Sequence, residues 1–173
     1  KDYREMFDKV KDSDAVTIST PDHMHAIQAI AAMQRGINVY VQKPLTHNIR
    51  EARMLTEMAR ENKIVTQMGN QGASNSGMTK VQEWFNDGKI GTVDEVFVWT
   101  NRPVWPQGIP VPKPTGSSSP DHLDWDLWLG TAPSIPYSDA YHPFNWRGWW
   151  AYGTGALGDM GCHIIDVPFR TLG

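Results

Sequence analysis

Asp14-Ala15-Val16-Thr17-Ile18-Ser19-Thr20 is a short run rich in β-branched residues, and Pro21-Asp22 ends it. Such a run predicts a buried strand whose C-terminal end leads into a turn. A helix is predicted before it over residues 1–11, because apolar residues recur there at three- and four-residue spacing. A second helix is predicted after it from His25 to Arg35, with Gly36 as its C-terminal cap.

The same alternation of strand and helix continues along the chain. Ile37 to Val41 predicts a second strand, which Gln42-Lys43-Pro44-Leu45 breaks because proline cannot donate to a β-ladder. Asn48 to Lys63 predicts an amphipathic helix, and Ile64 to Met68 predicts a third strand. This order predicts a right-handed parallel α/β unit, whose ligands lie beyond the carboxyl ends of the strands. We therefore expect the three loops that follow the strands to line one crevice.

The second half of the chain has a different pattern. A helix is predicted from Ser74 to Asn86, and a change of domain is placed near Ser74 by this change of pattern alone. Thr92 to Asn101 predicts a strand covered on both faces, which would open a second sheet. Residues 102–119 are rich in proline, glycine and serine and predict a long irregular loop. Asp124 to Gly130 predicts no more than a short helical turn.

The composition excludes several classes of protein. The chain has 173 residues, of which 40% are hydrophobic and 20% charged, as in a globular protein of one or two domains. Its formal net charge of −3 is small and its basic residues are scattered, so we expect no nucleic-acid or membrane partner. The single cysteine, Cys162, excludes an internal disulfide and leaves the compartment open between cytoplasm and periplasm.

A glycine-rich stretch near the C-terminal end, Gly153-Thr154-Gly155-Ala156-Leu157-Gly158, matches the dinucleotide-binding pattern G-x-G-x-x-G. That motif requires a preceding strand and an acidic residue about 20 positions later, whereas an aromatic run precedes it here. We therefore interpret these glycines as a sharp bend into a closely packed helix. The phosphate-binding turn of a dinucleotide domain is then expected upstream of Lys1, and we expect little activity from these residues alone.

The next residues suggest proton transfer. If a helix begins near Gly158, Asp159 and His163 stand one turn apart on the same face. Asp159 would lie in the first turn, where free N–H groups favour a carboxylate, and His163 could titrate near neutrality. The alternative is a structural carboxylate and a core histidine. A metal site that adds Asp166 is less favoured, because the helix offers one histidine and no second cluster, and we expect no metal.

Tryptophan is the unusual residue in this composition. The chain has eight tryptophans, and seven of them lie between Trp99 and Trp150, which predicts an aromatic surface or pocket. Trp146, Trp149 and Trp150 lie near Arg147 in the sequence and suit stacking on a sugar ring or a nicotinamide, with a core role as the alternative. Lys43 stands at the tip of the predicted second strand, where an ordinary surface lysine is the alternative.

Three motifs together resemble one family, the glucose-fructose oxidoreductase, inositol dehydrogenase and rhizopine-catabolism (Gfo/Idh/MocA) oxidoreductases. They are Thr20-Pro21-Asp22-x2-His25, the strand that ends in Gln42-Lys43-Pro44-Leu45, and Gly155-Ala156-Leu157-Gly158-Asp159-Met160-Gly161-Cys162-His163-Ile164-Ile165-Asp166. The resemblance implies a Rossmann domain that binds NAD or NADP, followed by an α/β domain with an open sheet. Residues 1–73 would be the C-terminal part of the first and residues 74–173 the N-terminal part of the second, as in an incomplete member.

The resemblance also implies a role for individual residues. The family's lysine falls on Lys43, and its D-x3-H pair falls on Asp159 and His163. Lys43 would orient the substrate hydroxyl and the nicotinamide ribose, His163 would take the hydroxyl proton, and Asp159 would bind the same hydroxyl. The implied cofactor contacts are Thr20, Pro21, His25, Gln42, Lys43 and Asn70, and the implied substrate contacts are Arg147, Trp149, Tyr152, Asp159 and His163.

The function implied by the resemblance is hydride transfer between NAD or NADP and a hydroxyl of a sugar, polyol or glycoside, by a homo-oligomer when the protein is full length. Gln42 departs from the glutamate usual in the family, although its amide can still bind a ribose hydroxyl. The Gln-Lys-Pro form of this motif, together with residues 66–71 and 146–150, is similar to a subgroup of the family. That subgroup includes the NAD-dependent glycosidases of glycoside hydrolase family 109. An NAD-recycling glycosidase is therefore one alternative, and a non-catalytic sugar-binding module is another.

Overall fold

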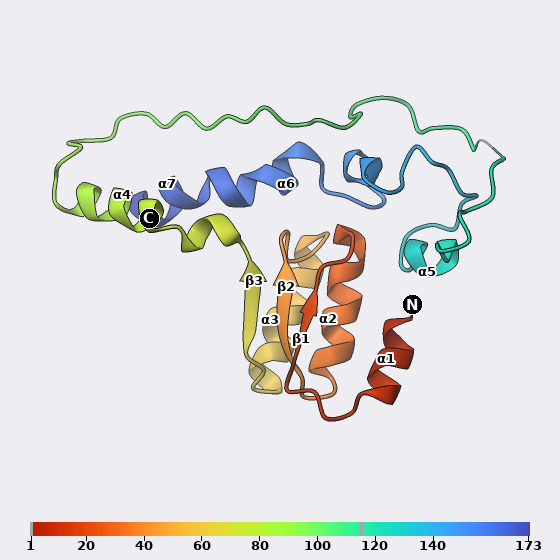
Figure 1. Cartoon of the computed structure of the whole chain (residues 1–173). Helices are drawn as coiled ribbons and strands as arrows, with labels where there is room; N and C mark the ends of the chain where they lie inside the picture. Colours follow the sequence, from red (N-terminus) through yellow and green to blue (C-terminus); the bar gives the residue numbers. More distant parts are fainter. Residues whose placement is uncertain (1, 115) are drawn as a thin grey trace.

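The computed structural model describes residues 2–114 and 116–173. The first half contains a parallel three-stranded sheet in the order β1-β2-β3 (Figure 1). Its strands are β1 (Ala15–Ile18), β2 (Asn38–Gln42) and β3 (Thr66–Gly69), so the three predicted strands are confirmed. Because all three run in the same direction, their carboxyl ends meet at one edge of the sheet.

The helices predicted around these strands are also present. They are α1 (Tyr3–Lys9), α2 (His25–Met33) and α3 (Ile49–Glu61), and α2 and α3 lie together on one side of the sheet (Figure 1). Ala29 and Ala32 of α2 have no exposed surface, since their small side chains allow the helix to pack closely on the sheet. The core contains Phe7, Ile18, Ala29, Ala32, Met33, Ile37, Val39, Val41 and Leu55.

A capping box holds the start of α3. Asn48 Oδ1 accepts a hydrogen bond from the backbone N–H of Glu51 at 3.0 Å, and Glu51 Oε2 accepts one from the N–H of Asn48 at 3.2 Å. We expect Asn48→Ala to lower the free energy of unfolding by about 1 kcal/mol, measured by urea denaturation. Glu57→Ala, at an exposed position of the same helix, should change it by less than about 0.5 kcal/mol. Equal losses in the two variants would argue against the capping role.

The second half of the chain is helical and irregular. Its helices are α4 (Ser76–Asn86), α5 (Trp125–Leu129), α6 (Gly155–Ile164) and α7 (Asp166–Leu172), and α7 packs against both α4 and α6. Short 3-10 helices are η1 (Asp22–Met24), η2 (Gln71–Ser74) and η3 (Asn145–Gly148). Among the described residues, no helix is both long enough and apolar enough to cross a bilayer.

The strand predicted from Thr92 to Asn101 is not formed. This segment is extended chain without a ladder partner, and it runs past α6 and α7 (Figure 1). The side chains of Phe97 and Trp99 are 75% and 80% exposed. The prediction rested on an apolar pattern, whereas a strand requires a partner backbone, and within residues 2–114 and 116–173 every strand lies between Ala15 and Gly69. The described residues therefore contain no second sheet.

The aromatic run forms a core of its own. Tyr141, Trp146, Trp149 and Tyr152 pack with Leu129 of α5, and each of these side chains is buried. The preceding segment, over residues 102–114 and 116–119, contains no helix or strand, which confirms the predicted irregular loop. Trp149, one of the tryptophans that predict an aromatic pocket, therefore belongs to a core and stabilises the fold.

Candidate active site

The C-terminal ends of β1 and β2 open onto a cavity of about 450 Å³. A volume of this size is typical of small-molecule sites, which range from about 300 to 1,000 Å³. One wall is formed by the loops that follow the strands, through Thr20, Pro21, Asp22, Gln42 and Lys43. The opposite wall comes from the second half of the chain, through Trp128, His142, Trp146, Arg147 and Asp159.

An ion pair joins the two walls. Lys43 Nζ donates to Asp159 Oδ1 at 2.6 Å and to the backbone carbonyl of Asp159 at 2.8 Å. The two side chains are only 16% and 15% exposed. A lysine ammonium has three N–H donors, so one remains for a ligand in the cavity. The pair therefore presents a cationic donor and a carboxylate to the same space, and Lys43 is not an ordinary surface lysine.

Helix α6 begins at Gly155 rather than near Gly158. Asp159 therefore lies in the second turn, and the prediction that it lies in the first turn is wrong. Its charge is balanced by Lys43 and not by the free N–H groups of a helix start. The 3-10 helix η3, and no strand, precedes the glycine-rich stretch, and Gly155 has a φ of 64°. The interpretation of these glycines as a bend into a helix is thus confirmed.

Asp22 bonds the loop after β1 to the entry of α6. Asp22 Oδ2 accepts hydrogen bonds from the backbone N–H of Thr154 at 3.2 Å and from its hydroxyl at 2.9 Å. Burial raises the pKa of Asp22, and the bonds from Thr154 oppose that shift. No local pattern predicts this role for Asp22, because a Pro-Asp pair after a strand predicts only a turn.

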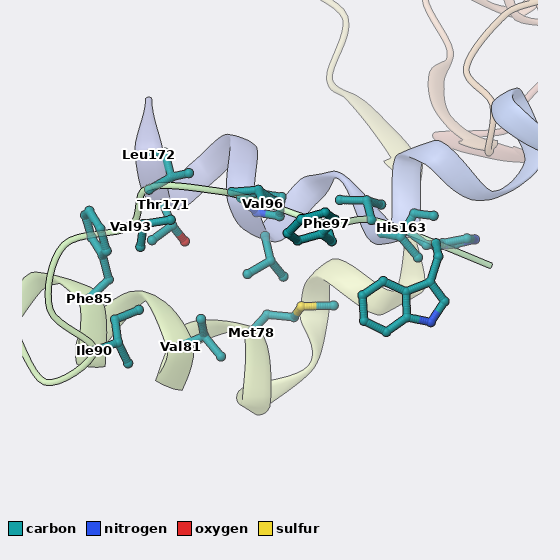
Figure 2. Close-up of a pocket in the computed structure, with 15 residues that line it drawn as sticks. Met78, Val81, Phe85, Ile90, Val93, Val96, Phe97, His163, Thr171 and Leu172 are labelled. Atoms are coloured by element: carbon teal, nitrogen blue, oxygen red, sulfur yellow. The ribbon is translucent and has the colours of Figure 1, made fainter.

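His163 lies one turn beyond Asp159 and lines a different pocket. This apolar groove of about 430 Å³ is formed by α4, α7 and the extended segment, with Met78, Val81 and Phe97 among its residues (Figure 2). Burial lowers the pKa of His163, with a smaller contribution from the Lys43 cation, while Asp159 acts in the opposite direction. The imidazole is therefore neutral at pH 7, which is the form that accepts a proton.

The predicted cofactor contacts divide into two groups. Thr20, Pro21 and Gln42 line the cavity. His25 is fully buried, and its ring nitrogens lie 2.7 Å from the carbonyl oxygen of Thr20 and 2.7 Å from that of Pro44. The His25 ring thus ties the loops after β1 and β2 together and has no surface to offer a ligand.

Asn70 is placed at the end of β3, outside the cavity. Its Nδ2 donates to the carbonyl oxygen of Cys162 in α6 at 2.5 Å. Its Oδ1 is buried and has no hydrogen-bond partner among residues 2–114 and 116–173. This side chain lines a separate pocket of about 290 Å³ together with Asp166. In this structure, Asn70 connects β3 to α6 and leaves one acceptor unused.

The predicted substrate contacts from the aromatic run are also divided. Arg147 lines the cavity, and its guanidinium lies 4.3 Å from the ring centre of Trp146. Trp149 and Tyr152 are 8% and 2% exposed and belong to the aromatic core, so the structure does not place them at the cavity. Burial raises the pKa of Tyr152 to about 12, which keeps its phenol protonated at neutral pH.

Trp128 and His142 line the cavity and were not predicted to do so. The ring of His142 meets that of Trp128 edge-on, with the ring centres 6.2 Å apart. Burial lowers the pKa of His142, with a smaller effect from His122. Trp128 lies in α5, whose short apolar pattern carries no sign of a binding role, so only its position in the fold reveals this wall.

Both halves of the chain match domains of one family. Residues 1–70 match the NAD-binding Rossmann fold of the GFO/IDH/MocA oxidoreductases, and residues 96–172 match their C-terminal alpha/beta domain. The chain belongs to the Gfo/Idh/MocA oxidoreductase family. The resemblance stated from the three motifs is thereby confirmed, together with the α/β fold class and NAD as the cofactor of the family. The domain boundary near Ser74 stays a prediction.

Several relatives are known in this family. Levoglucosan dehydrogenase of Pseudarthrobacter phenanthrenivorans is 25% identical over 99% of this chain and 36% of its own length. 2,7-Anhydro-N-acetylneuraminate hydratase of Mediterraneibacter gnavus is 26% identical over 48% of this chain and 22% of its own length. The crystal structure of myo-inositol 2-dehydrogenase from Lactobacillus plantarum shares the fold, with 24% identity, a TM-score of 0.50, and coverage of 54% of this chain and 27% of that one. This chain therefore spans little more than a third of these Gfo/Idh/MocA relatives at most.

The cavity residues fit the nicotinamide end of NAD or NADP. The cavity lies at the carboxyl ends of β1 and β2, where ligands of parallel α/β folds bind. Gln42 supplies an amide for a ribose hydroxyl, although its Oε1 already accepts from the N–H of Lys43 at 2.8 Å. Trp128 and Trp146 supply aromatic surface on the opposite wall. Polar groups on one side and rings on the other suit a ribose and a nicotinamide.

Proposed function

We propose that the protein transfers a hydride between NAD or NADP and the hydroxyl-bearing carbon of a sugar, polyol or glycoside. The observation that carries this proposal is the Lys43–Asp159 ion pair, which stands in the strand-end cavity of a chain with an NAD-binding Rossmann domain. A cation next to a substrate oxygen stabilises the negative charge that develops when the hydroxyl loses its proton.

Bound nicotinamide would supply the hydride acceptor, and the chain supplies positioning and proton transfer. The N–H of Lys43 that Asp159 leaves unused donates to the substrate hydroxyl oxygen. Asp159 holds the ammonium in place through two bonds and accepts a hydrogen bond from the same substrate. His163 lines the apolar groove and not this cavity, so its neutral imidazole accepts the hydroxyl proton only from a substrate that reaches past Asp159 to the next turn of α6.

The aromatic wall supports a carbohydrate as the substrate. Trp128 and Trp146 face the cavity from the side opposite the strand ends, and the C–H face of a sugar ring stacks well on such side chains. Arg147 lines the same wall and carries N–H donors suited to ring hydroxyls. This combination is typical of sites that bind small polar molecules with apolar faces.

The direct test is an assay of the full-length protein with NAD or NADP and a panel of sugars, polyols, inositols and glycosides. We expect the absorbance of reduced nicotinamide to appear with at least one member of the panel, and we expect Lys43→Met to abolish it. Binding of a sugar by calorimetry, without reduced cofactor and without chemical change in the sugar, would instead favour a non-catalytic sugar-binding module.

A relative named as a hydratase supports a second candidate, an NAD-recycling glycosidase. Such an enzyme oxidises one hydroxyl to a ketone, removes the proton from the adjacent carbon while the glycosidic oxygen leaves the carbon beyond it, adds water to the resulting double bond and returns the hydride. The cofactor ends the cycle in its starting form. Release of the aryl alcohol from an aryl glycoside without accumulation of reduced nicotinamide would favour this candidate, and accumulation without release would exclude it.

The pH dependence should report the imidazole of His163. Since its pKa is lowered from the usual value of 6.5, the base form predominates at neutral pH and is lost when the pH falls below that lowered pKa. We therefore expect kcat to be constant around neutrality and to fall in mildly acid solution, measured with saturating cofactor and substrate. His163→Gln should remove this acid limb along with most of the activity. An unchanged acid limb in the variant would assign it to another group.

A further inference from the structure

A buried carboxylate connects the loop that follows β1 to the residue that precedes α6. Asp22 is 7% exposed, and Oδ2 receives both the backbone N–H and the hydroxyl of Thr154. A buried carboxylate with two such bonds is a strong connection, since charge-assisted hydrogen bonds are about twice as strong as neutral ones. Asp22 and Thr154 therefore connect the two walls of the cavity through bonds separate from those of the ion pair.

The residues at the start of α6 do not by themselves determine the backbone conformation there or the orientation of the helix. Glycines at 153 and 155 flank Thr154, and glycine has the least backbone preference of all residues. Thr154 does not use its side chain to cap the helix. Bonds to distant parts of the chain must therefore decide where α6 starts and how it is oriented, and the bond to Asp22 is one of them.

Gly158 makes room for this connection. A Cβ at position 158 would overlap the side chain of Thr154, including the hydroxyl that bonds to Asp22. The glycine at this helical position thus allows Thr154 to point towards the loop after β1. The same turn of helix continues directly to Asp159, because the N–H of Gly158 donates to the carbonyl oxygen of Thr154 at 3.3 Å.

The contact of Asp159 with Lys43 depends on the position of α6 in two ways. Lys43 Nζ is bonded both to the carboxylate and to the backbone carbonyl of Asp159. A carboxylate can follow a moving partner by changing its rotamer, whereas a backbone carbonyl can do so only if the helix moves. A shift of α6 would therefore break at least one of the two bonds.

We propose that Asp22 and Thr154 are a positioning pair that sets α6 against the strand-end loops, so that Asp159 holds Lys43 in its working position. This inference rests on the proposed function for its effect on turnover, and the position of Lys43 itself can be tested without turnover. Neither residue needs to contact the reacting atoms in this role.

The experiment compares three variants of the full-length protein. Thr154→Val removes the hydroxyl and keeps the shape, and Thr154→Ser restores the hydroxyl. Thr131→Val is the matched control, because the Thr131 hydroxyl donates to the backbone of the same loop, at the carbonyl oxygen of His23 and 3.1 Å away, without reaching α6. Each protein is treated briefly with an amine-acetylating reagent, and acetylation of Lys43 is measured by peptide mass spectrometry relative to that of the exposed Lys89.

We expect Lys43 to be acetylated several-fold faster in Thr154→Val than in the wild type, because the ammonium loses partners that shield it. Thr154→Ser and Thr131→Val should match the wild type. Equal Lys43 labelling in all four proteins would overturn the inference. Faster labelling in both valine variants would also overturn it, since it would show general loosening, which the melting temperature would register as well.

Turnover gives a second measurement. Thr154→Val should lower kcat by about tenfold or more with little change in the Kd for the cofactor, because misplacement of a catalytic group acts on the reaction step. An unchanged kcat together with faster labelling would contradict the link to catalysis. If the wild type shows no hydride transfer on any substrate, the proposed function fails, while the labelling still decides whether Thr154 positions α6.

Discussion

Replacing Lys43 with methionine should lower kcat/KM by about a thousandfold, since removal of one preorganised donor from an active site typically costs a factor of 10² to 10³. Methionine is unbranched and nearly as long as lysine, and it removes the charge that contacts Asp159 and faces the cavity. The measurement is steady-state kinetics with any substrate that the panel assay identifies. Circular dichroism on the same samples should show a folded protein.

The control for this variant is Lys89→Met. Lys89 forms an ion pair with Asp87 at 3.0 Å, and its side chain is 59% exposed. Exposed pairs of this kind contribute about 0 to 1 kcal/mol, so neither activity nor stability should change appreciably. A Lys43→Met enzyme that keeps more than about a tenth of its activity would contradict a role in stabilising charge on the reacting oxygen.

Replacing Gly158 with alanine should disrupt the entry of α6, whereas the same change at Gly161 should not. The added methyl at 158 overlaps the side chain of Thr154, and we expect a loss of about 2 kcal/mol in the free energy of unfolding, as for other overpacked sites. At 161 the methyl would lie 3.6 Å from side-chain carbons of Leu157 and Ile165, which is ordinary contact. Alanine there should stabilise the helix by about 0.5 to 1 kcal/mol.

The free energy of unfolding of the two variants is measured by urea denaturation. The variants are a matched pair, because both substitutions lie in the same helix and add one methyl group. Gly158→Ala should also speed the acetylation of Lys43, because it displaces the hydroxyl that bonds to Asp22. If the two variants have the same stability, the close approach of Thr154 to Gly158 does not matter to the protein in solution.

Some of the residues that line the cavity can be predicted from local sequence patterns, and others cannot. Thr20, Pro21, Gln42 and Lys43 could be placed there from the sequence, because proline and a change of pattern mark strand ends, and parallel strands end at the same edge. His25 follows the same strand, yet it is used inside the fold, where its ring binds two carbonyl oxygens. Nothing local distinguishes a histidine that faces a cavity from one that binds backbone.

The aromatic run is a second example of residues whose use cannot be predicted from the local sequence. Trp149 and Tyr152 were assigned to the substrate by resemblance, but they are buried in the second core, whereas Trp128 lines the cavity. An aromatic ring gains free energy from burial in a core and from forming a binding wall alike, so composition cannot separate the two uses. The catalytic roles of Lys43, Asp159 and His163 stay predictions until the variants are measured.

The sequence by itself determined the order of strands and helices in the first half and the strand-end position of Lys43. Apolar residues at every second position favour a strand, and apolar residues at three- and four-residue spacing favour a helix. This information is local in the sequence. It also identified the family, because three separated motifs occur in one order.

Only the tertiary structure decided what those residues meet. Lys43 and Asp159 are 116 residues apart, and Asp22 and Thr154 are 132 residues apart. The segment from Thr92 to Asn101 has a strand-like pattern and forms no strand among the described residues, because pairing requires a second backbone at the right distance. Periodicity states which face of an element is apolar, whereas long-range packing and buried hydrogen bonds determine which partner covers it.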